Sequence, residues 1–264
     1  MPDKPLVRTE IAGVKPEHLD YMFGDFRTTV ENRIMALRAQ NDANGERGAA
    51  FFEFLLMDVD EAAFARMQQQ FLGDADNAEN KNMLKYIDPV TWFDSKLSIA
   101  RWLALDRQAP LRILDLGTGP GHFPIVARFY GHRVTGTDLP KRASGSHKSG
   151  HLYDALCELY GVNRIGHVIR PFAPLGDVGG RYDMVTAFLA AFNIDENKKP
   201  WSEAHWRFFL TDLKANVLTE RGVVFMRLTH DKLSDKAWDY LVSLSEWHED
   251  QSRQVYITDL SRLS

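Results

Sequence analysis

The chain has very little cysteine and no long hydrophobic run. Cys157 is the only cysteine among its 264 residues, which excludes a disulfide within the chain and a cysteine-based metal site. No apolar stretch reaches the roughly 20 residues that a membrane-spanning helix needs. The polar N-terminal segment also lacks the apolar core of a signal peptide. We therefore expect a cytoplasmic protein that does not act at a membrane.

An excess of positive charge is also lacking. The formal net charge is −4, and the basic residues form no stripe along the chain. Proteins that bind nucleic acid usually carry such a stripe or a basic excess, so we expect no nucleic-acid partner. The hydrophobic fraction of 44% and the charged fraction of 26% are those of an ordinary globular protein. The length allows one large domain or a core domain with an extension.

The most informative segment is LRILDLGTGPGHFPIVARFYGHRVTGTDLP, residues 111–140. Its pattern predicts a strand over 111–116, a helix over 122–130 and a second strand over 133–137. A unit of this kind holds a nucleoside at the carboxyl ends of its strands. Asp138 follows the second strand directly, where a carboxylate can accept hydrogen bonds from both hydroxyls of a ribose.

The loop of this segment favours one nucleoside cofactor over another. Gly117, Gly119 and Gly121 have the spacing G-x-G-x-G, whereas a dinucleotide fingerprint requires a small residue where His122 stands. Asp115, at the end of the first strand, would repel a pyrophosphate. The same acid can hold the ammonium group of S-adenosylmethionine (SAM), directly or through water. SAM is therefore favoured, while a dinucleotide and a turn that binds nothing remain the alternatives.

The sequence D-L-G-T-G-P-G resembles the first motif of the class I SAM-dependent methyltransferases. YDMVTAFLAAFN and NVLTERGVVFMRL resemble the fourth-strand and fifth-strand motifs of the same family, so the resemblance covers about residues 92–230. It implies a Rossmann-like α/β fold with a doubly wound, mostly parallel sheet, SAM as the cofactor, and methyl transfer to oxygen or nitrogen of a small molecule. A sugar, a glycan precursor and a secondary metabolite are candidate acceptors.

The chain departs from the family pattern in two places. Members often carry an acid after the third strand that binds the adenine amino group, but here the sequence is Arg170-Pro171-Phe172. Adenine is expected to stack on Phe172 instead. The family also usually ends in a β-hairpin, whereas the pattern here predicts only one strand after the last helix, so the sheet edge is expected to be truncated or differently ordered.

Two parts are expected along the chain. Residues 1–90 are interpreted as an N-terminal helical cap, and residues 91–264 as the Rossmann-like SAM-binding domain. Thr91 and Asp94 have the spacing of a capping box at the start of a helix. The cap is expected to cover the cleft and shape acceptor specificity, although a role in a homodimer is equally open. Further strands are expected over 166–170, 182–189, 223–228 and 255–259.

The candidate site residues fall into three groups. The cofactor-binding candidates are Asp115, Leu116, Gly117, Thr118, Gly119, Gly121, Asp138, Leu139, Phe172 and Phe188. The substrate-binding candidates are Tyr86 and Trp92, whose flat apolar rings can shield a sulfonium or a substrate ring. The catalytic candidates lie after the fourth strand: Asn193 to bind the acceptor, and Asp195 or His205 to take its proton. No metal is expected.

Each of the three catalytic candidates also has a plain structural interpretation. Asn193 fits a loop or cap, Asp195 a solvated acid, and His205 an exposed histidine on a helix. Because the loop after the fourth strand lacks a strong catalytic signature such as N-P-P-Y, a non-catalytic SAM-binding sensor or partner subunit is the alternative function. A methyltransferase that acts on protein is another, and an NAD-dependent oxidoreductase is disfavoured by His122.

Overall fold

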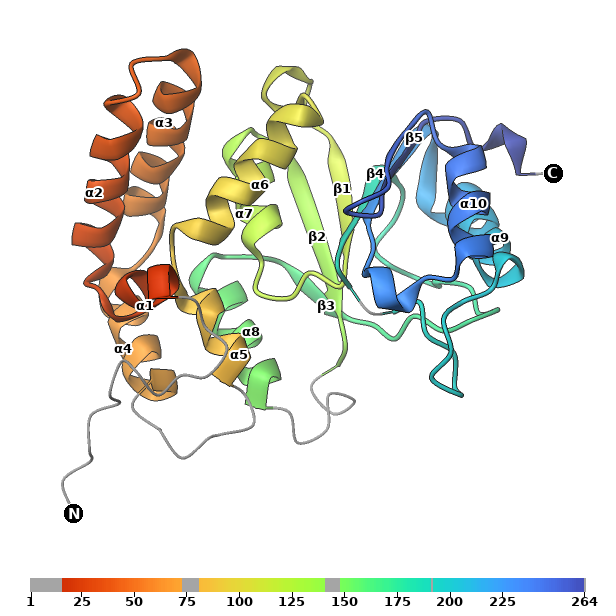
Figure 1. Ribbon diagram of the computed structural model, residues 1–264, viewed down its shortest axis with the longest axis horizontal. Coiled ribbons are helices and arrows are strands. Elements are labelled where there is room, and N and C mark those ends of the chain that lie inside the picture. The colour runs from red at the N-terminus through yellow and green to blue at the C-terminus, as the bar shows by residue number, and fades with distance from the viewer. Residues whose placement is uncertain (1–15, 73–80, 141–147, 191, 264) are drawn as a thin grey trace. The chain divides into compact units, whose positions relative to one another are not determined.

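The computed structural model describes residues 16–72, 81–140, 148–190 and 192–263 (Figure 1). The chain divides into two compact units. The first, which we call the helical unit, comprises 1–107, 120–130 and 144–162. The second, which we call the sheet unit, comprises 108–119, 131–143 and 163–264. The predicted boundary at residue 90 stays a prediction.

The helical unit contains helices from both sides of the glycine loop in sequence. Its α-helices are α1 (Pro16–Phe23), α2 (Phe26–Arg38), α3 (Ala43–Asp58), α4 (Glu61–Leu72), α5 (Lys81–Leu84), α6 (Thr91–Trp102), α7 (His122–Phe129) and α8 (Lys148–Leu159). Short 3-10 turns follow α5 at Lys85–Ile87 and α6 at Leu105–Arg107. The helices α2 and α3 pack against each other (Figure 1).

Aromatic side chains hold α7 within the helical unit. The ring of Phe51 on α3 lies 5.4 Å from that of Phe129 on α7 and 5.2 Å from that of Phe93 on α6. Both Phe51 and Phe93 are fully buried. Burial of side chains of this size stabilises the packed helices by about 2 kcal/mol or more each. The contact with Phe129 therefore anchors the end of α7.

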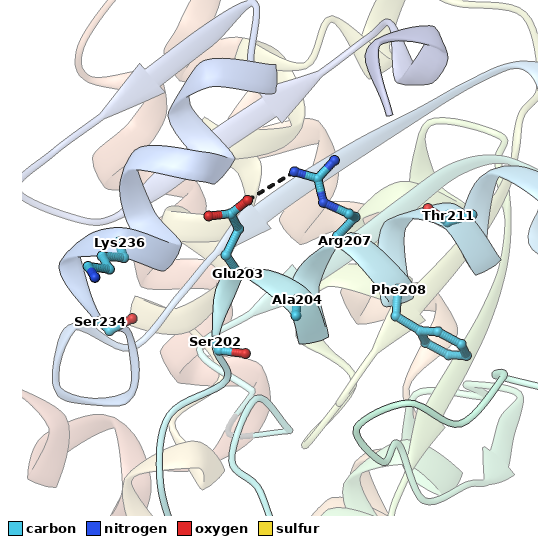
Figure 2. A pocket seen from close by; sticks show the side chains of 8 residues that line it. All are labelled: Ser202, Glu203, Ala204, Arg207, Phe208, Thr211, Ser234 and Lys236. Carbon is cyan, nitrogen blue, oxygen red and sulfur yellow. Dashed lines mark hydrogen bonds and ion pairs between the residues drawn. The ribbon is translucent and has the colours of Figure 1, made fainter. Parts of the chain in front are cut away.

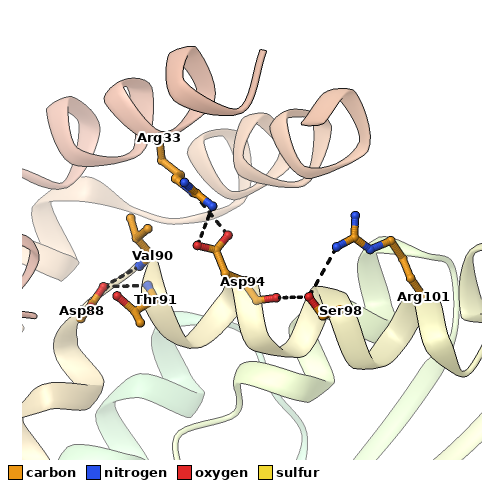
Figure 3. A network of polar contacts seen from close by, with 7 residues as sticks. All are labelled: Arg33, Asp88, Val90, Thr91, Asp94, Ser98 and Arg101. Atoms are coloured by element: carbon orange, nitrogen blue, oxygen red, sulfur yellow. Dashed lines mark hydrogen bonds and ion pairs between the residues drawn. The ribbon is translucent and has the colours of Figure 1, made fainter. Parts of the chain in front are cut away.

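The start of α6 is capped by the side chain of Asp88 (Figure 3). Asp88 accepts hydrogen bonds from the backbone N–H groups of Val90 and Thr91 at 2.8 and 3.0 Å. The expected capping box is wrong, because the Asp94 carboxylate turns away from the helix start and pairs with Arg33 of α2 at 2.8 Å. Asp94 therefore links two helices of the unit.

The sheet unit is built on seven strands in the order β3-β2-β1-β4-β5-β7-β6. The strands are β1 (Arg112–Leu116), β2 (Arg133–Asp138), β3 (Arg164–Gly166), β4 (Tyr182–Phe188), β5 (Leu218–Arg227), β6 (Trp247–Glu249) and β7 (Gln254–Ile257). Strands β1 to β5 are parallel, and β7 is antiparallel to both β5 and β6. This confirms the expected mostly parallel α/β sheet. The first five strands follow the classic Rossmann order.

Two expectations about the sheet are wrong. The third strand ends at Gly166 instead of spanning 166–170, because residues 167–181 leave the sheet and bury Leu175 and Val178 in the core of the unit. The Leu175 N–H is held there by Asp212 at 2.7 Å. At the other edge, two strands follow the last helix where one was expected. They form the terminal hairpin that the family resemblance implies, so this edge is complete.

The core of the sheet unit packs around α9 (Glu203–Asp212) and α10 (Asp235–Leu244). It contains large side chains without exposure, such as Trp201 and Trp206, beside residues of β1, β4 and β5. Within the described part of the chain, every helix is too short or too polar to pass through a bilayer. The cellular compartment stays a prediction.

Candidate functional site

The glycine loop has a backbone that only glycine adopts readily. Gly117 and Gly119 have φ angles of +65° and +56°, in the left-handed region. At Gly117 a side chain is excluded by space as well, since a Cβ there would lie 2.3 Å from the Cβ of Ala190. The predicted turn is therefore present, with Ala190 packed against it at Gly117, and contact of this backbone with a ligand stays a prediction.

Gly121 ends the loop at the start of α7, within the helical unit. Its φ is +82°. A Cβ at this position would lie 2.9 Å from Val162 and 3.3 Å from the sulfur of Cys157. Close packing against Cys157 of α8 and against Val162 thus explains why this position is a glycine. Whether it also contacts a cofactor stays a prediction.

Asp138 ties the second strand to the loop. One carboxylate oxygen accepts the N–H of Gly119 at 2.8 Å, and the other accepts the N–H of Leu139 at 2.7 Å. Asp138 remains partly exposed. Each carboxylate oxygen has a second lone-pair site, so ribose hydroxyls can still bind here. The arrangement fits the predicted role.

Asp115 lies deeper than a typical ligand-binding acid. It is 2% exposed, and both of its oxygens accept hydrogen bonds from hydroxyls, one from Thr186 at 2.6 Å and one from Thr118 at 3.0 Å. The predicted contact of Thr118 with the cofactor is restricted as well, since Thr118 is 7% exposed. The two side chains hydrogen-bond to each other, and Asp115 also binds the neighbouring strand; their contact with a cofactor stays a prediction.

The remaining cofactor candidates differ in how accessible they are. The Leu116 side chain is fully buried in the core, so only its backbone faces a ligand, whereas Leu139 is 46% exposed beside Asp138. The ring of Phe188 lies 5.7 Å from that of Phe225 on β5 and is partly buried. Of these three side chains, Leu139 is the most exposed.

Phe172 packs against α9 and not against the end of the third strand. Its ring lies 4.4 Å from that of His205 and 5.9 Å from that of Phe208. It has a φ of +53° and is 57% exposed. The expectation of adenine stacking rested on a longer third strand, which the structure does not have. Phe172 shares its surroundings with a catalytic candidate instead, and an adenine contact stays a prediction.

Asn193 offers a buried acceptor atom near the carboxyl end of β4. The residue is fully buried. Its side-chain nitrogen donates to the backbone carbonyl of Lys232, and its backbone carbonyl accepts the N–H of Trp201 at 2.9 Å. Within the described residues, its side-chain oxygen has no hydrogen-bond partner. A buried polar atom of this kind costs free energy unless a water or ligand satisfies it, which suits the predicted contact with an acceptor.

The two proton-acceptor candidates have local structural roles. One oxygen of Asp195 accepts the N–H groups of Asn197 and Lys199 at 2.8 and 2.9 Å and so closes its own loop. The Nδ1 of His205 accepts the N–H of Ser202 at 3.0 Å at the start of α9. The lone pair that a neutral imidazole would use as a base is therefore engaged.

Tyr86 and Trp92 lie together in the helical unit, with ring centroids 4.8 Å apart. The indole N–H of Trp92 donates to the carbonyl of Lys85 at 2.7 Å. Trp92 stacks on His18, whose Nδ1 lies 2.7 Å from the fully buried carboxylate of Asp88. Sequence reasoning missed this histidine–aspartate pair, because the two residues are 70 positions apart. Contact of Tyr86 and Trp92 with a substrate stays a prediction.

His122, the first residue of α7, is buried among aromatic rings of the helical unit. Its ring lies 4.9 Å from that of Phe93 and 5.9 Å from that of Tyr160. Burial, followed by the nearby charge of Lys96, lowers the pKa of His122 from 6.5 to about 3. The imidazole is therefore neutral at physiological pH.

An open groove of about 730 Å³ lies elsewhere on the sheet unit (Figure 2). Glu203 and Arg207 in its wall pair with each other at 2.9 Å, so these charges are not directed at a ligand. Among the described residues, its lining shares none of the predicted site residues. The groove is lined by Ser202, Glu203, Ala204, Arg207, Phe208, Thr211, Ser234 and Lys236. Within the described residues, no cluster of three or more metal-ligating side chains occurs.

The residues that sequence reasoning missed are the partners of the loop. Gly136 of β2 leaves the room that Thr118 fills, since a Cβ on Gly136 would lie 2.4 Å from the Thr118 hydroxyl. Ala190, which follows β4, packs against Gly117, and Thr186 of β4 donates a hydrogen bond to Asp115. A glycine within a strand is a signal of close approach, so Gly136 could have been found from the sequence.

Comparisons with known proteins extend this picture only at low identity. No protein-family model matches the chain, and no curated protein shows significant similarity. Among solved structures, ribosomal protein L11 methylase from Lactobacillus delbrueckii subsp. bulgaricus is 19% identical, with a TM-score of 0.40 over 62% of this chain and 74% of its own. The PH0226 protein from Pyrococcus horikoshii OT3 is 16% identical, with a TM-score of 0.40 over 64% and 76%.

A third solved structure is that of SAM-bound CalS10, an amino pentose methyltransferase from Micromonospora echinaspora. It is 22% identical, with a TM-score of 0.38 over 56% of each chain. These structures are what the chain is similar to, and the structure of the chain itself has a Rossmann-like α/β sheet with a glycine loop at the carboxyl end of β1.

Proposed function

We propose that this protein is a SAM-dependent methyltransferase that methylates oxygen or nitrogen of a small molecule. The observation that carries the proposal is the loop after β1. Gly117 and Gly119 hold left-handed backbone there, and the partly exposed carboxylate of Asp138 lies against the loop. Backbone without side chains admits a ligand closely, and an acid at the tip of the adjacent strand can bind ribose hydroxyls.

The residues present fit the predicted cofactor. When bound, SAM supplies a methyl group on a sulfonium, which is electrophilic without help from the protein. The task of the chain is then to hold the two reactants in line and close together. Asn193 supports acceptor binding, because its buried side-chain oxygen lacks a partner among the described residues and can accept a hydrogen bond from a hydroxyl or an amine.

Calorimetric titration of the purified protein tests the cofactor. The ligands are SAM, its demethylated product S-adenosylhomocysteine, and NAD. We expect both adenosyl ligands to bind with micromolar affinity and NAD to give no heat of binding. Binding of NAD alone would overturn the assignment of the loop. Absence of binding by all three ligands would show that the loop is a turn without a nucleoside site.

A non-catalytic SAM-binding role is the second candidate, and one observation favours it. Each predicted proton acceptor uses an acceptor atom in local structure: Oδ1 of Asp195 in its loop and Nδ1 of His205 at the start of α9. An amine that is already deprotonated needs no base, so this arrangement supports nitrogen methylation or no chemistry at all more than oxygen methylation.

Transfer of labelled methyl groups separates these functions. The protein is incubated with methyl-labelled SAM and, in separate reactions, with a metabolite extract and with a protein extract. Label in small molecules supports the proposal, and label in protein supports a protein methyltransferase. Binding of SAM without transfer to any acceptor supports the non-catalytic role. The variant Asn193→Ala is expected to lower transfer at least tenfold while SAM affinity stays within about twofold.

A further inference from the structure

The acid of the loop motif is enclosed by hydroxyl groups of its own sheet unit. Asp115 is 2% exposed. Its Oδ1 accepts the Thr186 hydroxyl at 2.6 Å, and its Oδ2 accepts the Thr118 hydroxyl at 3.0 Å. An acid that binds the ammonium group of a ligand must present an oxygen to that ligand. Here the oxygens are turned toward the protein.

The sheet register explains why Thr186 reaches this acid. Asp115 on β1 stands opposite Thr186 on β4 and opposite Gly136 on β2. Residues at one level of adjacent parallel strands place their side chains on the same face of the sheet. Thr186 is fully buried. Because its hydroxyl donates to a charged carboxylate, this hydrogen bond is of the strong, charge-assisted kind.

The carboxylate in turn restrains the middle of the glycine loop. Thr118 donates its hydroxyl to the side chain and to the carbonyl of Asp115, and its N–H binds the carbonyl of Thr137 at 2.8 Å. Its side chain fills the space that Gly136 leaves. The next residue is Gly119, whose N–H is held by Asp138. The loop is thus fixed from β1, β2 and β4 before any ligand arrives.

We propose that Asp115 and Thr186 are positioning residues, which hold the glycine loop in its ligand-binding conformation, and that Asp115 acts on the loop instead of on the ammonium group of SAM. The proposal rests on the proposed function for the identity of the ligand. It assigns a role to Thr186, a residue outside the loop motif, and it changes the role expected for the motif acid.

Two ligands distinguish the roles. SAM carries the amino-acid tail, whereas methylthioadenosine keeps the adenosine and the sulfur but lacks the tail. We expect Thr186→Val and Asp115→Asn each to weaken both ligands by the same factor, about tenfold, because each change removes one charge-assisted hydrogen bond from the Thr186–Asp115–Thr118 chain that holds the loop. Thr186→Ser keeps the hydroxyl and is expected to restore both affinities to within about twofold. Calorimetry supplies the dissociation constants.

Asp183→Asn is the matched control, because Asp183 lies at the opposite end of β4 and accepts the N–H of Arg112 at 2.9 Å. Both affinities are expected to stay unchanged in this variant. If Asp115→Asn weakens SAM and leaves methylthioadenosine unchanged, Asp115 binds the ammonium group and the proposal is wrong. If Thr186→Val changes neither affinity, its hydroxyl does not position the loop.

Amide hydrogen exchange tests the same proposal without any ligand. Thr186→Val is expected to speed exchange of the Thr118 and Gly119 N–H groups about tenfold relative to the wild type, and Asp183→Asn is expected not to. Unchanged exchange in Thr186→Val contradicts the proposal even if the wild type fails to bind SAM. If Thr186→Val does not fold, Thr118→Ala is measured instead, with the same expectation for Gly119.

Discussion

His122 makes the stability of the helical unit depend on pH. Its imidazole is 3% exposed, and burial lowers its pKa from 6.5 to about 3. In the unfolded chain the same group binds a proton at its ordinary pKa. Because the folded pKa lies below the unfolded one, the stabilisation is fully present above pH 6.5 and is lost as the pH falls toward 3.

The pKa values set the size of the effect. Below the unfolded pKa, each decrease of one pH unit lowers the free energy of unfolding by about 1.4 kcal/mol, as long as the folded imidazole stays neutral. Between pH 8 and pH 5 the loss is therefore about 2 kcal/mol, and it approaches about 5 kcal/mol near pH 3. A loss of about 2 kcal/mol is a substantial part of the stability of a typical domain.

Urea unfolding at pH 8 and pH 5, followed by tryptophan fluorescence, measures this loss. The variant His122→Gln removes the titrating group, so we expect it to lose about 2 kcal/mol less than the wild type between the two pH values. His248→Gln, at an exposed histidine, is the matched control and should keep the wild-type dependence. Equal losses in wild type and His122→Gln would refute the reasoning, as would an imidazole of His122 that titrates above pH 5 by NMR.

Three further substitutions probe the site and the helical unit. Gly117→Ala should abolish SAM binding and lower the melting temperature, because the new Cβ would lie 2.3 Å from Ala190; unchanged calorimetry would contradict this. Asp138→Ala should raise the dissociation constant for SAM at least tenfold without altering the circular dichroism spectrum, and an unchanged constant would remove its assignment. Asp88→Ala should cost about 2–4 kcal/mol of unfolding free energy, because it uncaps α6 and leaves His18 unpaired. Urea unfolding measures this loss, and a clearly smaller loss would contradict the prediction.

The unit from β1 to β2 follows from local sequence. The predicted strands 111–116 and 133–137 and the helix 122–130 agree with β1, β2 and α7 to within one or two residues. An apolar run, glycines and a terminal acid are enough here, because positive φ angles, helix ends and strand burial depend on neighbouring residues. The positions of the glycines and of Asp138 in the candidate site were predictable for the same reason.

Segments that depend on distant partners were not predictable in this way. The third strand is shorter than its pattern indicated, because residues 167–181 gain more by burying Leu175 and Val178 than by extending the sheet. Of the last strand pair, β7 was expected and β6 was missed, because β6 has only three residues. A strand of three residues has too short a pattern to be predicted alone, and it is stabilised by its hydrogen bonds to β7.

The sequence by itself determined where the chain turns and which backbone positions must lack a side chain. Only the tertiary structure decided which partners the candidate functional groups have. Asp115 reads as a ligand-binding acid in the sequence, yet Thr186, 71 residues away, takes one of its oxygens. His205 reads as a base, yet it accepts the N–H of Ser202. The physical reason is that a side chain's role depends on which partners satisfy its hydrogen bonds, and folding brings those partners from other strands and helices.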